Sequence, residues 1–396
     1  MRDVHDAAAE APGGAGVPNR VFTSERRDRS VHDAAAEAPG GAGVPTTQPP
    51  VRDLPDVGEL QRIAASGGID HLGVAEAKIL SRTRDELFAR RDAGLHAGMA
   101  FTYRNPERST DPGRTLAGAR SVIVGARSYV PAIEPRRPEG VMASVARYSW
   151  TDHYADLRVG LALVADALRQ AGERAVVLAD DNAIVDREVA HQAGLGWYGK
   201  NANVLIHGAG SFFVLGCVLT TAHYEPSAPT PAGFAEGCGS CRRCIDACPT
   251  GAIVSDGVID ANRCLAWVLQ RPGPVPVELR AAVGDRIYGC DECQTSCPPT
   301  MRLGQRHRRD VPAAEAWVDV LELLSSSDDE LLARHGRWYI AGRDPRWLRR
   351  NALIVLGNTA PAGDPDVDAA LARYRRDGDP ILAETAQWAH DQLGGA

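Results

Sequence analysis

The chain has 396 residues, of which 44% are apolar and 24% charged, as in a globular protein of two or three domains. Its net charge of −7 excludes a globally basic nucleic-acid-binding protein, so any contact with RNA needs a local basic face. No apolar run approaches the roughly eighteen residues of a transmembrane helix, and no basic-then-apolar signal pattern opens the chain. We therefore expect a cytoplasmic protein with no membrane partner. Its nine cysteines are then metal ligands or catalysts rather than disulfides.

The first fifty residues differ from the rest of the chain. The segment "VHDAAAEAPGGAGVP" occurs at 4–18 and again, letter for letter, at 31–45. It is rich in Ala, Gly and Pro and holds almost no bulky apolar residues, so it cannot bury enough surface to offset its ordering entropy. We expect residues 1–50 to form a disordered extension.

Helices and strands alternate from residue 56 to residue 225, which predicts an α/β domain. Val57, Leu60 and Ile63 have helical spacing and are followed by a Gly-Gly stop. Runs rich in Val, Ile and Leu indicate buried strands. The expected helices cover 57–66, 81–94, 153–172 and a segment from 185 that breaks at Gly194; the expected strands cover 71–75, 121–130, 174–181 and 211–221.

Two aspartates close the strand at 174–181, and the carboxyl end of a strand is where α/β folds commonly place chemistry. Asp180 and Asp181 are therefore candidate functional carboxylates, and Asp186 follows at the start of the next helix. Structural roles compete with these interpretations, because Asp181 also suits a helix N-cap and Asp186 suits a first-turn acid beside Arg187.

The rest of the chain divides into two further predicted domains. A Pro- and Ala-rich linker at 226–233 leads into a cysteine-rich domain at 234–300, and only helical patterns follow at 301–396. The segments 349–361 and 379–393 have amphipathic helical patterns, the second with Asp379 as N-cap and Pro380 at the first helical position. Paired helices of this kind favour a short HEAT-like repeat.

Eight cysteines have the arrangement of a double iron–sulfur protein. The first four are spaced C-x2-C-x2-C-x3-C and are followed by proline, as in bacterial ferredoxins, where the fourth cysteine binds the other cluster. The predicted ligand sets are Cys238, Cys241, Cys244 and Cys297 for one [4Fe–4S] cluster, and Cys248, Cys264, Cys290 and Cys293 for the other.

Zinc is the competing interpretation of these cysteines. Structural zinc sites commonly use two C-x2-C halves, and the x2, x2, x3 spacing before proline fits them poorly. Gly239 and Gly251 give the backbone room around the cysteines. The ninth cysteine, Cys217, lies in an apolar strand and is expected to be a core residue.

A basic segment at 331–350 is the candidate RNA face. It combines six arginines and one aspartate with Trp338, Tyr339 and Trp347. Arginines bind phosphates and aromatic rings stack on unpaired bases, although the tryptophans also suit a core and the arginines an ordinary charged surface. The candidate tRNA-binding residues are Arg334, Arg337, Arg343, Arg346, Arg349 and Arg350.

Several stretches together resemble the epoxyqueuosine reductases of tRNA modification. They include "GMAFTYRNPERSTDP" (98–112), "ARYSWTDHY" (146–154), "DREVAHQAGLGWYGKN" (186–201), "DRIYGCDECQTSCP" (285–298) and "RRNALIVLGN" (349–358). The resemblance extends over roughly 56–395, nearly all of the chain after the repeats.

This resemblance implies a cobalamin bound by the α/β domain, which would be related to corrinoid reductive dehalogenases, with a ferredoxin-like domain beside it. It implies reduction of epoxyqueuosine to queuosine at the tRNA wobble position. Asp180 would be the proton donor, with Asp186 as second choice, because the leaving oxygen needs a general acid. The implied cofactor-binding residues are Arg104, Tyr148, Asp180, Gly196, Trp197, Lys200, Asn201, Ser211, Thr250 and Gly251.

Structural alternatives stay open for some of these residues. Lys200 also suits a solvated loop, and Arg104 a charged surface. One departure from the family concerns Asp152-His153-Tyr154, where relatives usually have Asp-Tyr-His, so the roles of His153 and Tyr154 are open.

The resemblance also implies partners. They are tRNA carrying epoxyqueuosine and an external electron donor of the flavodoxin or ferredoxin type, and the chain is expected to be a monomer. Two other functions remain open: a corrinoid iron–sulfur reductase of a small molecule, and a non-catalytic two-cluster electron carrier.

Overall fold

A computed structural model of the chain describes residues 53–394 except 102, 229–236 and 312–313. The predicted disordered extension at 1–50 lies outside the described residues, as does most of the linker at 226–233. Residues from Pro50 onward form one compact unit. No helix within the described ranges is long and apolar enough to cross a membrane.

The first part of this unit is built around a four-stranded sheet of order β1-β2-β8-β5, with strands at His71–Glu76, Ser121–Ser128, Phe213–Thr220 and Ala175–Ala179. Every neighbouring pair is antiparallel. The helix–strand alternation was therefore right about the elements, but the sheet is not the parallel one typical of α/β folds. The strand β8 lies between β2 and β5 and runs opposite to both.

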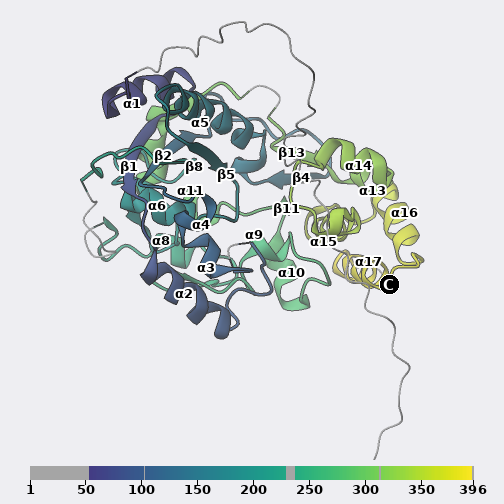
Figure 1. Cartoon of the computed structure of the whole chain (residues 1–396). Helices are drawn as coiled ribbons and strands as arrows, with labels where there is room; N and C mark the ends of the chain where they lie inside the picture. The colour runs from purple at the N-terminus through teal and green to yellow at the C-terminus, as the bar shows by residue number, and fades with distance from the viewer. Residues whose placement is uncertain (1–52, 102, 229–236, 312–313, 395–396) are drawn as a thin grey trace, which may run out of the picture. The chain divides into compact units, whose positions relative to one another are not determined.

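Helices cover both faces of this sheet (Figure 1). On one face α1 (Val57–Ser66) and α5 (His153–Gln170) pack on Ile123 and Val218; on the other, α6 (Asp186–Gln192) packs near Val122 and Cys217. Successive residues of β2 and β8 alternate between the two cores, as strand geometry requires. The expected core position of Cys217 is confirmed, since its side chain is fully buried.

Side-chain caps fix where the long helices begin. Asp56 accepts a hydrogen bond from the Glu59 amide at 2.7 Å, and Asp152 accepts one from Ala155 at 2.9 Å. Asp152 is therefore the N-cap of α5, which places His153 and Tyr154 in its first turn. The other elements of this part are α2 (Ser81–Asp92), α3 (Pro106–Ser109), α4 (Pro112–Thr115), β3 (Val130–Pro131), η1 (Arg147–Ser149), β6 (Gly196–Tyr198) and β7 (Val204–Ile206).

The cysteine-rich part consists of short elements, with most cysteines at or between their ends. They are α8 (Arg243–Asp246), the hairpin of β9 (Ile253–Ser255) and β10 (Val258–Ile259), α9 (Leu265–Val268), α10 (Val277–Val283), α11 (Glu292–Thr295), α12 (Pro298–Leu303), η2 (Gly304–His307) and β12 (Arg308–Arg309). The strand β12 pairs in parallel with β3 and so returns the chain to the first part.

A C-terminal set of helices follows. It contains α13 (Val320–Ser325), α14 (Asp328–His335), η3 (Ala341–Arg343), α15 (Arg346–Thr359), α16 (Pro365–Tyr374) and α17 (Pro380–Gln392). Both predicted amphipathic helices are confirmed as α15 and α17, and Asp379 caps α17 with Pro380 at its first position. They pack closely, since a side chain at Gly357 would meet Ala389. Their HEAT-like character stays a prediction.

A second, three-stranded sheet joins all three parts. Its order is β11-β4-β13, with strands at Arg286–Tyr288, Met142–Val145 and Trp317–Asp319. One strand comes from each predicted domain, and the sheet lies between the first part and the C-terminal helices (Figure 1). Ala143, Ile287 and Val318 bury their side chains in the core of the C-terminal helices. The three parts therefore share one core instead of meeting as separate globules.

Candidate active site and iron–sulfur segment

Asp180 stands exposed directly after β5, with φ of +53°. This left-handed conformation is uncommon outside glycine, although aspartate tolerates it better than most residues. Burial is the main cause that raises the pKa of Tyr154 and Tyr288, and the negative charge of Asp180 adds to both shifts, so Asp180 lies within electrostatic range of both hydroxyl groups. The sharp turn thus presents the first-choice carboxylate at the open end of a buried strand.

Asp186 is the first residue of α6 and is partly buried. Burial raises its pKa, with a smaller contribution from Asp180, against the opposing charge of Arg187. Its Oδ1 accepts a hydrogen bond from the Arg187 amide at 2.7 Å. Asp181 is not the N-cap of α6; its Oδ1 accepts from the Ala183 amide at 2.8 Å, within the connecting turn. Of the three aspartates, Asp180 and Asp186 therefore form one electrostatic group.

Tyr154 and Tyr288 interact electrostatically with Asp180, and Tyr148 adjoins Tyr288. Burial raises the pKa of Tyr154, Tyr148 and Tyr288, in the last case to about 12. The Tyr148 and Tyr288 rings are 6.3 Å apart, and the Tyr148 hydroxyl accepts a hydrogen bond from Gln270 at 2.8 Å. These groups stay protonated at neutral pH, so they are hydrogen-bond donors rather than anions. Their convergence near Asp180 makes this the candidate active site.

The structure separates the two residues of the unusual His153-Tyr154 pair. Tyr154 faces Asp180 and Asp186, whereas His153 is buried with its ring centroid 5.7 Å from that of Tyr129. Burial lowers the pKa of His153 to about 4, with Arg127 adding to the effect. A neutral, buried imidazole is a core group, so Tyr154 is the member of the pair that belongs to the site.

Most of the predicted cofactor-binding residues make hydrogen bonds or ion pairs within the protein. Lys200 is buried and pairs with Asp256 at 3.2 Å, which rules out the solvated-loop alternative. The Asn201 amide donates to the Cys293 carbonyl at 2.8 Å. Ser211 bonds the Thr300 hydroxyl at 3.0 Å. These contacts tie the first part of the chain to the cysteine-rich part.

Three other predicted cofactor-binding residues have fewer polar contacts within the described part of the protein. Arg104 is exposed, and Gly196 lies in β6 beside Trp197. The Trp197 Nε1–H is buried and has no acceptor within the described part of the chain. This orphaned donor fits a group that brings its own carbonyl acceptors, as the amide side chains of a corrin do.

Two further predicted residues adjoin the cysteines. Thr250 donates to the Arg263 carbonyl at 2.7 Å, and its hydroxyl lies 3.8 Å from the Cys248 sulfur. Gly251 has φ of +59°, a conformation that favours glycine in the tight turn after Cys248.

The first predicted cluster set comes together in the structure. Burial and the neighbouring thiols of Cys297, Cys238 and Cys241 raise the pKa of Cys244 to about 11. These four residues come from the loop around α8 and from the end of α11, some fifty positions later in the chain. The grouping is the one that the ferredoxin spacing predicts.

The second set adjoins the first. Burial raises the pKa of Cys293 well above its ordinary value, and the neighbours that add to the effect include Cys264, Cys290 and Cys244. The neighbouring Cys248 adds to the raised pKa of Cys264, whose main cause is burial. Hydrogen bonds reach the sulfurs of this set, among them those from the Ala252 amide to Cys248 at 3.2 Å and from the Asn203 side chain to Cys293 at 3.9 Å. Such bonds stabilise thiolates bound to a cluster.

The eight thiols are not arranged for a single ion. Within the described ranges, no three His, Cys, Asp or Glu side chains could hold one metal ion together. The four thiolates around a [4Fe–4S] cluster bind four different iron atoms, so they stand farther apart than the ligands of one zinc ion. The donor set and its grouping fit two clusters.

One predicted tRNA-binding residue is wrong. Arg350 is fully buried and donates to the backbone carbonyls of Leu269 and Arg271, so it cannot contact a phosphate. Burial lowers its pKa to about 9, and the side chain therefore remains charged at neutral pH. Its role is to hold the loop that follows Cys264 and α9.

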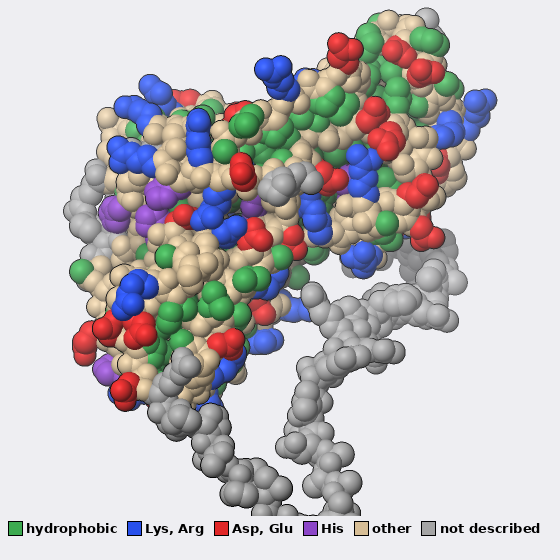
Figure 2. Space-filling view, turned by 90° about the horizontal axis from the view of Figure 1, so that it is seen from above, with side chains coloured by type: hydrophobic (Ala, Val, Ile, Leu, Met, Phe, Trp, Pro, Cys, Tyr) green, Lys and Arg blue, Asp and Glu red, His purple; other side chains and the backbone are tan. Residues whose placement is uncertain are grey.

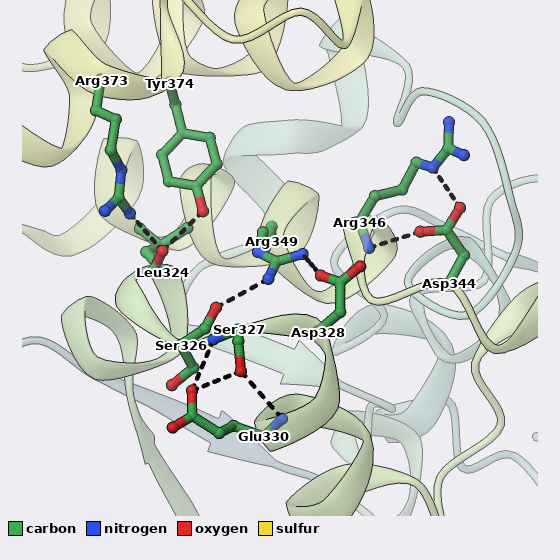
Figure 3. A network of polar contacts seen from close by, with 10 residues as sticks. All are labelled: Leu324, Ser326, Ser327, Asp328, Glu330, Asp344, Arg346, Arg349, Arg373 and Tyr374. Atoms are coloured by element: carbon green, nitrogen blue, oxygen red, sulfur yellow. Dashed lines mark hydrogen bonds and ion pairs between the residues drawn. The ribbon is translucent and has the colours of Figure 1, made fainter.

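The other predicted arginines are largely occupied by acidic neighbours or backbone carbonyls. Arg349 contacts Asp328 and the Ser326 carbonyl, and Arg346 contacts Asp344 (Figure 3). Arg334 and Arg337 both pair with Glu315, while exposed Arg343 donates to the Gly336 carbonyl. On the face drawn in Figure 2, Lys and Arg side chains stand among Asp and Glu instead of forming one basic field.

The aromatic residues of the same segment differ in exposure. Trp338 is buried and stacks on Tyr288 with a centroid distance of 4.6 Å, so the core alternative holds for it. Tyr339 is 53% exposed, and its amide donates to the Tyr288 hydroxyl at 2.8 Å. Tyr339 therefore presents an open ring beside the candidate active site. Sequence reasoning missed Tyr288 and Asn203: Tyr288 lies inside the family-like stretch at 285–298 but was not singled out, and Asn203 belongs to none of the quoted stretches.

Comparison with known proteins decides the family. An epoxyqueuosine reductase from Bacillus anthracis is 32% identical over 339 residues, which cover 83% of this chain and 86% of the relative. The chain belongs to the epoxyqueuosine reductase family. Residues 237–300 of this family member also match the 4Fe-4S double cluster binding domain, so it carries two [4Fe–4S] clusters.

Solved reductases have the same fold as this family member. A crystal structure of an epoxyqueuosine reductase with an epoxyqueuosine-modified tRNA-Tyr stem loop matches with a TM-score of 0.75 at 30% identity, covering 85% of this chain and 90% of that one. The Bacillus subtilis reductase, with a catalytic aspartate loop swung out of the active site, matches with a TM-score of 0.73 at 28% identity over the same shares. The predicted likeness to reductive dehalogenases stays a prediction.

Proposed function

We propose that this protein reduces epoxyqueuosine at the wobble position of tRNA to queuosine. The observation that carries the proposal is the convergence of Asp180, Tyr154 and Tyr288 in a chain that shares its fold with a reductase solved with the modified stem loop. The site lies close to the buried cysteine set, since Tyr129 interacts with both Tyr154 and Cys293.

The reaction sets what the site must deliver. Reduction of the epoxide to an alkene consumes two electrons and two protons and releases the oxygen as water. The breaking C–O bond leaves an alkoxide, which departs poorly unless a general acid protonates it. The chain therefore has to supply an electron path and a proton donor at the same place.

Two [4Fe–4S] clusters would provide the electron path. Cys238, Cys241, Cys244 and Cys297 would hold one, and the partly buried set of Cys248, Cys264, Cys290 and Cys293 the other. Cys244 of the first set interacts electrostatically with Cys293 of the second, so the two clusters would be neighbours. Cobalamin, held by residues that include Trp197 and Tyr148, would supply a low-potential cobalt centre next to the substrate when bound.

Asp180 would hold the proton that the leaving oxygen takes. It is exposed and stands on a strained turn, whereas Asp186 is partly buried and accepts a hydrogen bond from a backbone amide. Tyr154 and Tyr288 keep their protons, mainly because they are buried, and would act beside Asp180 as hydrogen-bond donors. The displaced aspartate loop of the Bacillus subtilis reductase supports a turn that moves during the reaction.

The tRNA would meet the segment from Arg337 to Arg343. Tyr339 offers an open ring for an unpaired base, and exposed Arg343 offers its guanidinium to a phosphate. This segment adjoins the candidate site through the bond from Tyr339 to Tyr288. An acidic protein can then contact RNA locally without a large basic field.

The test compares two neighbouring aspartates in anaerobic protein loaded with iron, sulfide and cobalamin. Asp180→Asn should lower the rate of epoxyqueuosine conversion by about a hundredfold to ten-thousandfold, as loss of a general acid does. Asp181→Asn is the matched control, because this exposed side chain only caps a turn. Equal rates for the two variants would remove Asp180 from the mechanism.

The same preparation separates the rival functions. Wild-type protein that binds cobalamin but leaves epoxyqueuosine-modified tRNA unchanged would favour a corrinoid reductase of a small molecule. Protein with two clusters and no affinity for cobalamin would favour an electron carrier.

A further inference from the structure

The two cysteine sets differ in their access to solvent. Cys241 is exposed, and Cys238 is partly so. The four cysteines of the second set are all only partly accessible, and none of them is exposed. Electrons from outside therefore meet the first set before the second.

A hollow of about 570 Å³ opens beside the first set. Its walls come from the segment between Cys244 and Cys248 and from the residues that flank Cys297. Ala247, Pro298 and half-exposed Met301 give it an apolar floor. The hollow is thus lined by the sequence neighbours of Cys297 and by the segment that joins Cys244 to Cys248.

The rim of this hollow is basic. Arg243 and Arg302 both line it and are exposed, and neither makes an ion pair within the described part of the chain. Asp246, also on the rim, faces Arg242 at 3.7 Å. Three arginines thus stand against one aspartate, in a protein whose net charge is −7. A local positive rim on an acidic protein favours approach of a partner with an acidic face.

We propose that this hollow and its arginine rim, called here the donor face, dock an acidic one-electron carrier protein. The proposal rests on the proposed function and adds to it the entry point for electrons. The carrier would place its flavin or iron–sulfur edge over the apolar floor while its carboxylates meet Arg243 and Arg302. One electron then passes per encounter, so the carrier is oxidised and the first cluster reduced by one electron. No bond forms or breaks, and two encounters supply one epoxide reduction.

The test uses the cluster-loaded full chain and a recombinant acidic flavodoxin, in the absence of tRNA. Binding of oxidised flavodoxin is measured by titration, and reduction of the clusters by reduced flavodoxin is followed by stopped-flow absorbance. The variants are Arg243→Glu, Arg302→Glu and both together. Arg62→Glu is the control, because Arg62 is an exposed residue of α1 that makes no ion pair in the described structure.

At low ionic strength, the double variant should lower the affinity for flavodoxin and the bimolecular rate at least about tenfold, and this difference should shrink in high salt. Arg62→Glu should change both by much less. Photoreduced deazariboflavin, a small uncharged donor, should reduce all variants at the wild-type rate, which shows that the first cluster is intact.

Three results would overturn the proposal. The first is unchanged flavodoxin binding in the double variant. The second is an equal loss of the cluster reduction rate with deazariboflavin. The third is a loss of tRNA stem-loop affinity with flavodoxin binding intact, which would assign the face to RNA. Since both main readouts omit tRNA, they hold even if epoxyqueuosine proves not to be the substrate.

Discussion

Replacing Tyr339 with alanine should weaken binding of the tRNA anticodon stem loop by about fivefold to tenfold. Stacking of a base on an aromatic side chain contributes about 1–3 kcal/mol. Tyr339 is 53% exposed, and its ring lies 6.0 Å from that of Trp267, so one side is already in contact with the protein. We therefore expect the lower part of that range, about 1–1.4 kcal/mol, which corresponds to the stated change in Kd.

The substitution leaves the site behind Tyr339 in place, because the bond to the Tyr288 hydroxyl comes from the backbone amide. The expected result is a higher KM for tRNA with an unchanged rate at saturation. Fluorescence anisotropy with a labelled stem loop measures the affinity, and single-turnover conversion measures the rate.

Two controls make the result specific. Tyr339→Phe keeps the ring and should bind like the wild type, while Phe101→Ala removes another exposed ring, 45% exposed, from a different segment. If Tyr339→Ala binds the stem loop as tightly as the wild type, or if Phe101→Ala has the same effect, the reasoning about the open ring is refuted.

Two other predictions concern the clusters and the core. Cys248→Ser should perturb the cluster held by Cys264, Cys290 and Cys293 and leave the other cluster intact, so the iron content should fall from about eight to about four atoms per chain. An electron paramagnetic resonance spectrum that shows loss of the solvent-accessible cluster instead would contradict the ligand sets. Burial lowers the pKa of His335 to about 4, against an ordinary value of 6.5. Between these two pH values the unfolded state binds more protons than the folded state, so the free energy of unfolding decreases as the pH is lowered. The decrease amounts to about 2 kcal/mol at pH 5. The thermal midpoint of His335→Gln should therefore fall less than that of the wild type between pH 7 and pH 5, and parallel pH profiles would show that this imidazole is not kept neutral.

The cysteine pattern could be predicted because cluster geometry restricts ligand spacing. The grouping of Cys297 with Cys244 follows from one motif, and the structure brings the same residues together. Whether they bind iron as assigned stays a prediction. Two helix boundaries were also readable, because Asp379 and the glycines after α1 carry local signals.

The pairing of the strands and the burial of individual side chains could not be predicted from local sequence patterns. The alternation of elements could not show that β8 enters between β2 and β5 and makes the sheet antiparallel. The strands β4, β11 and β13 have four residues or fewer, too short for a periodic signal. In the sequence, Arg350 cannot be told apart from the neighbouring arginines. The fold shows that its guanidinium is buried and donates to the backbone carbonyls of another segment.

The three-stranded sheet of β11, β4 and β13 has a consequence for how this protein can be shortened or recombined. Because β13 pairs with β4, a chain that stops before Trp317 would leave one side of β4 as an open edge and uncover apolar side chains such as Ala143 and Ile287. Such a fragment is expected to aggregate even with both clusters in place. The C-terminal helices are thus a folding requirement for the reductase core, and a gene fusion that exchanged them for another RNA-binding module would have to keep that third strand.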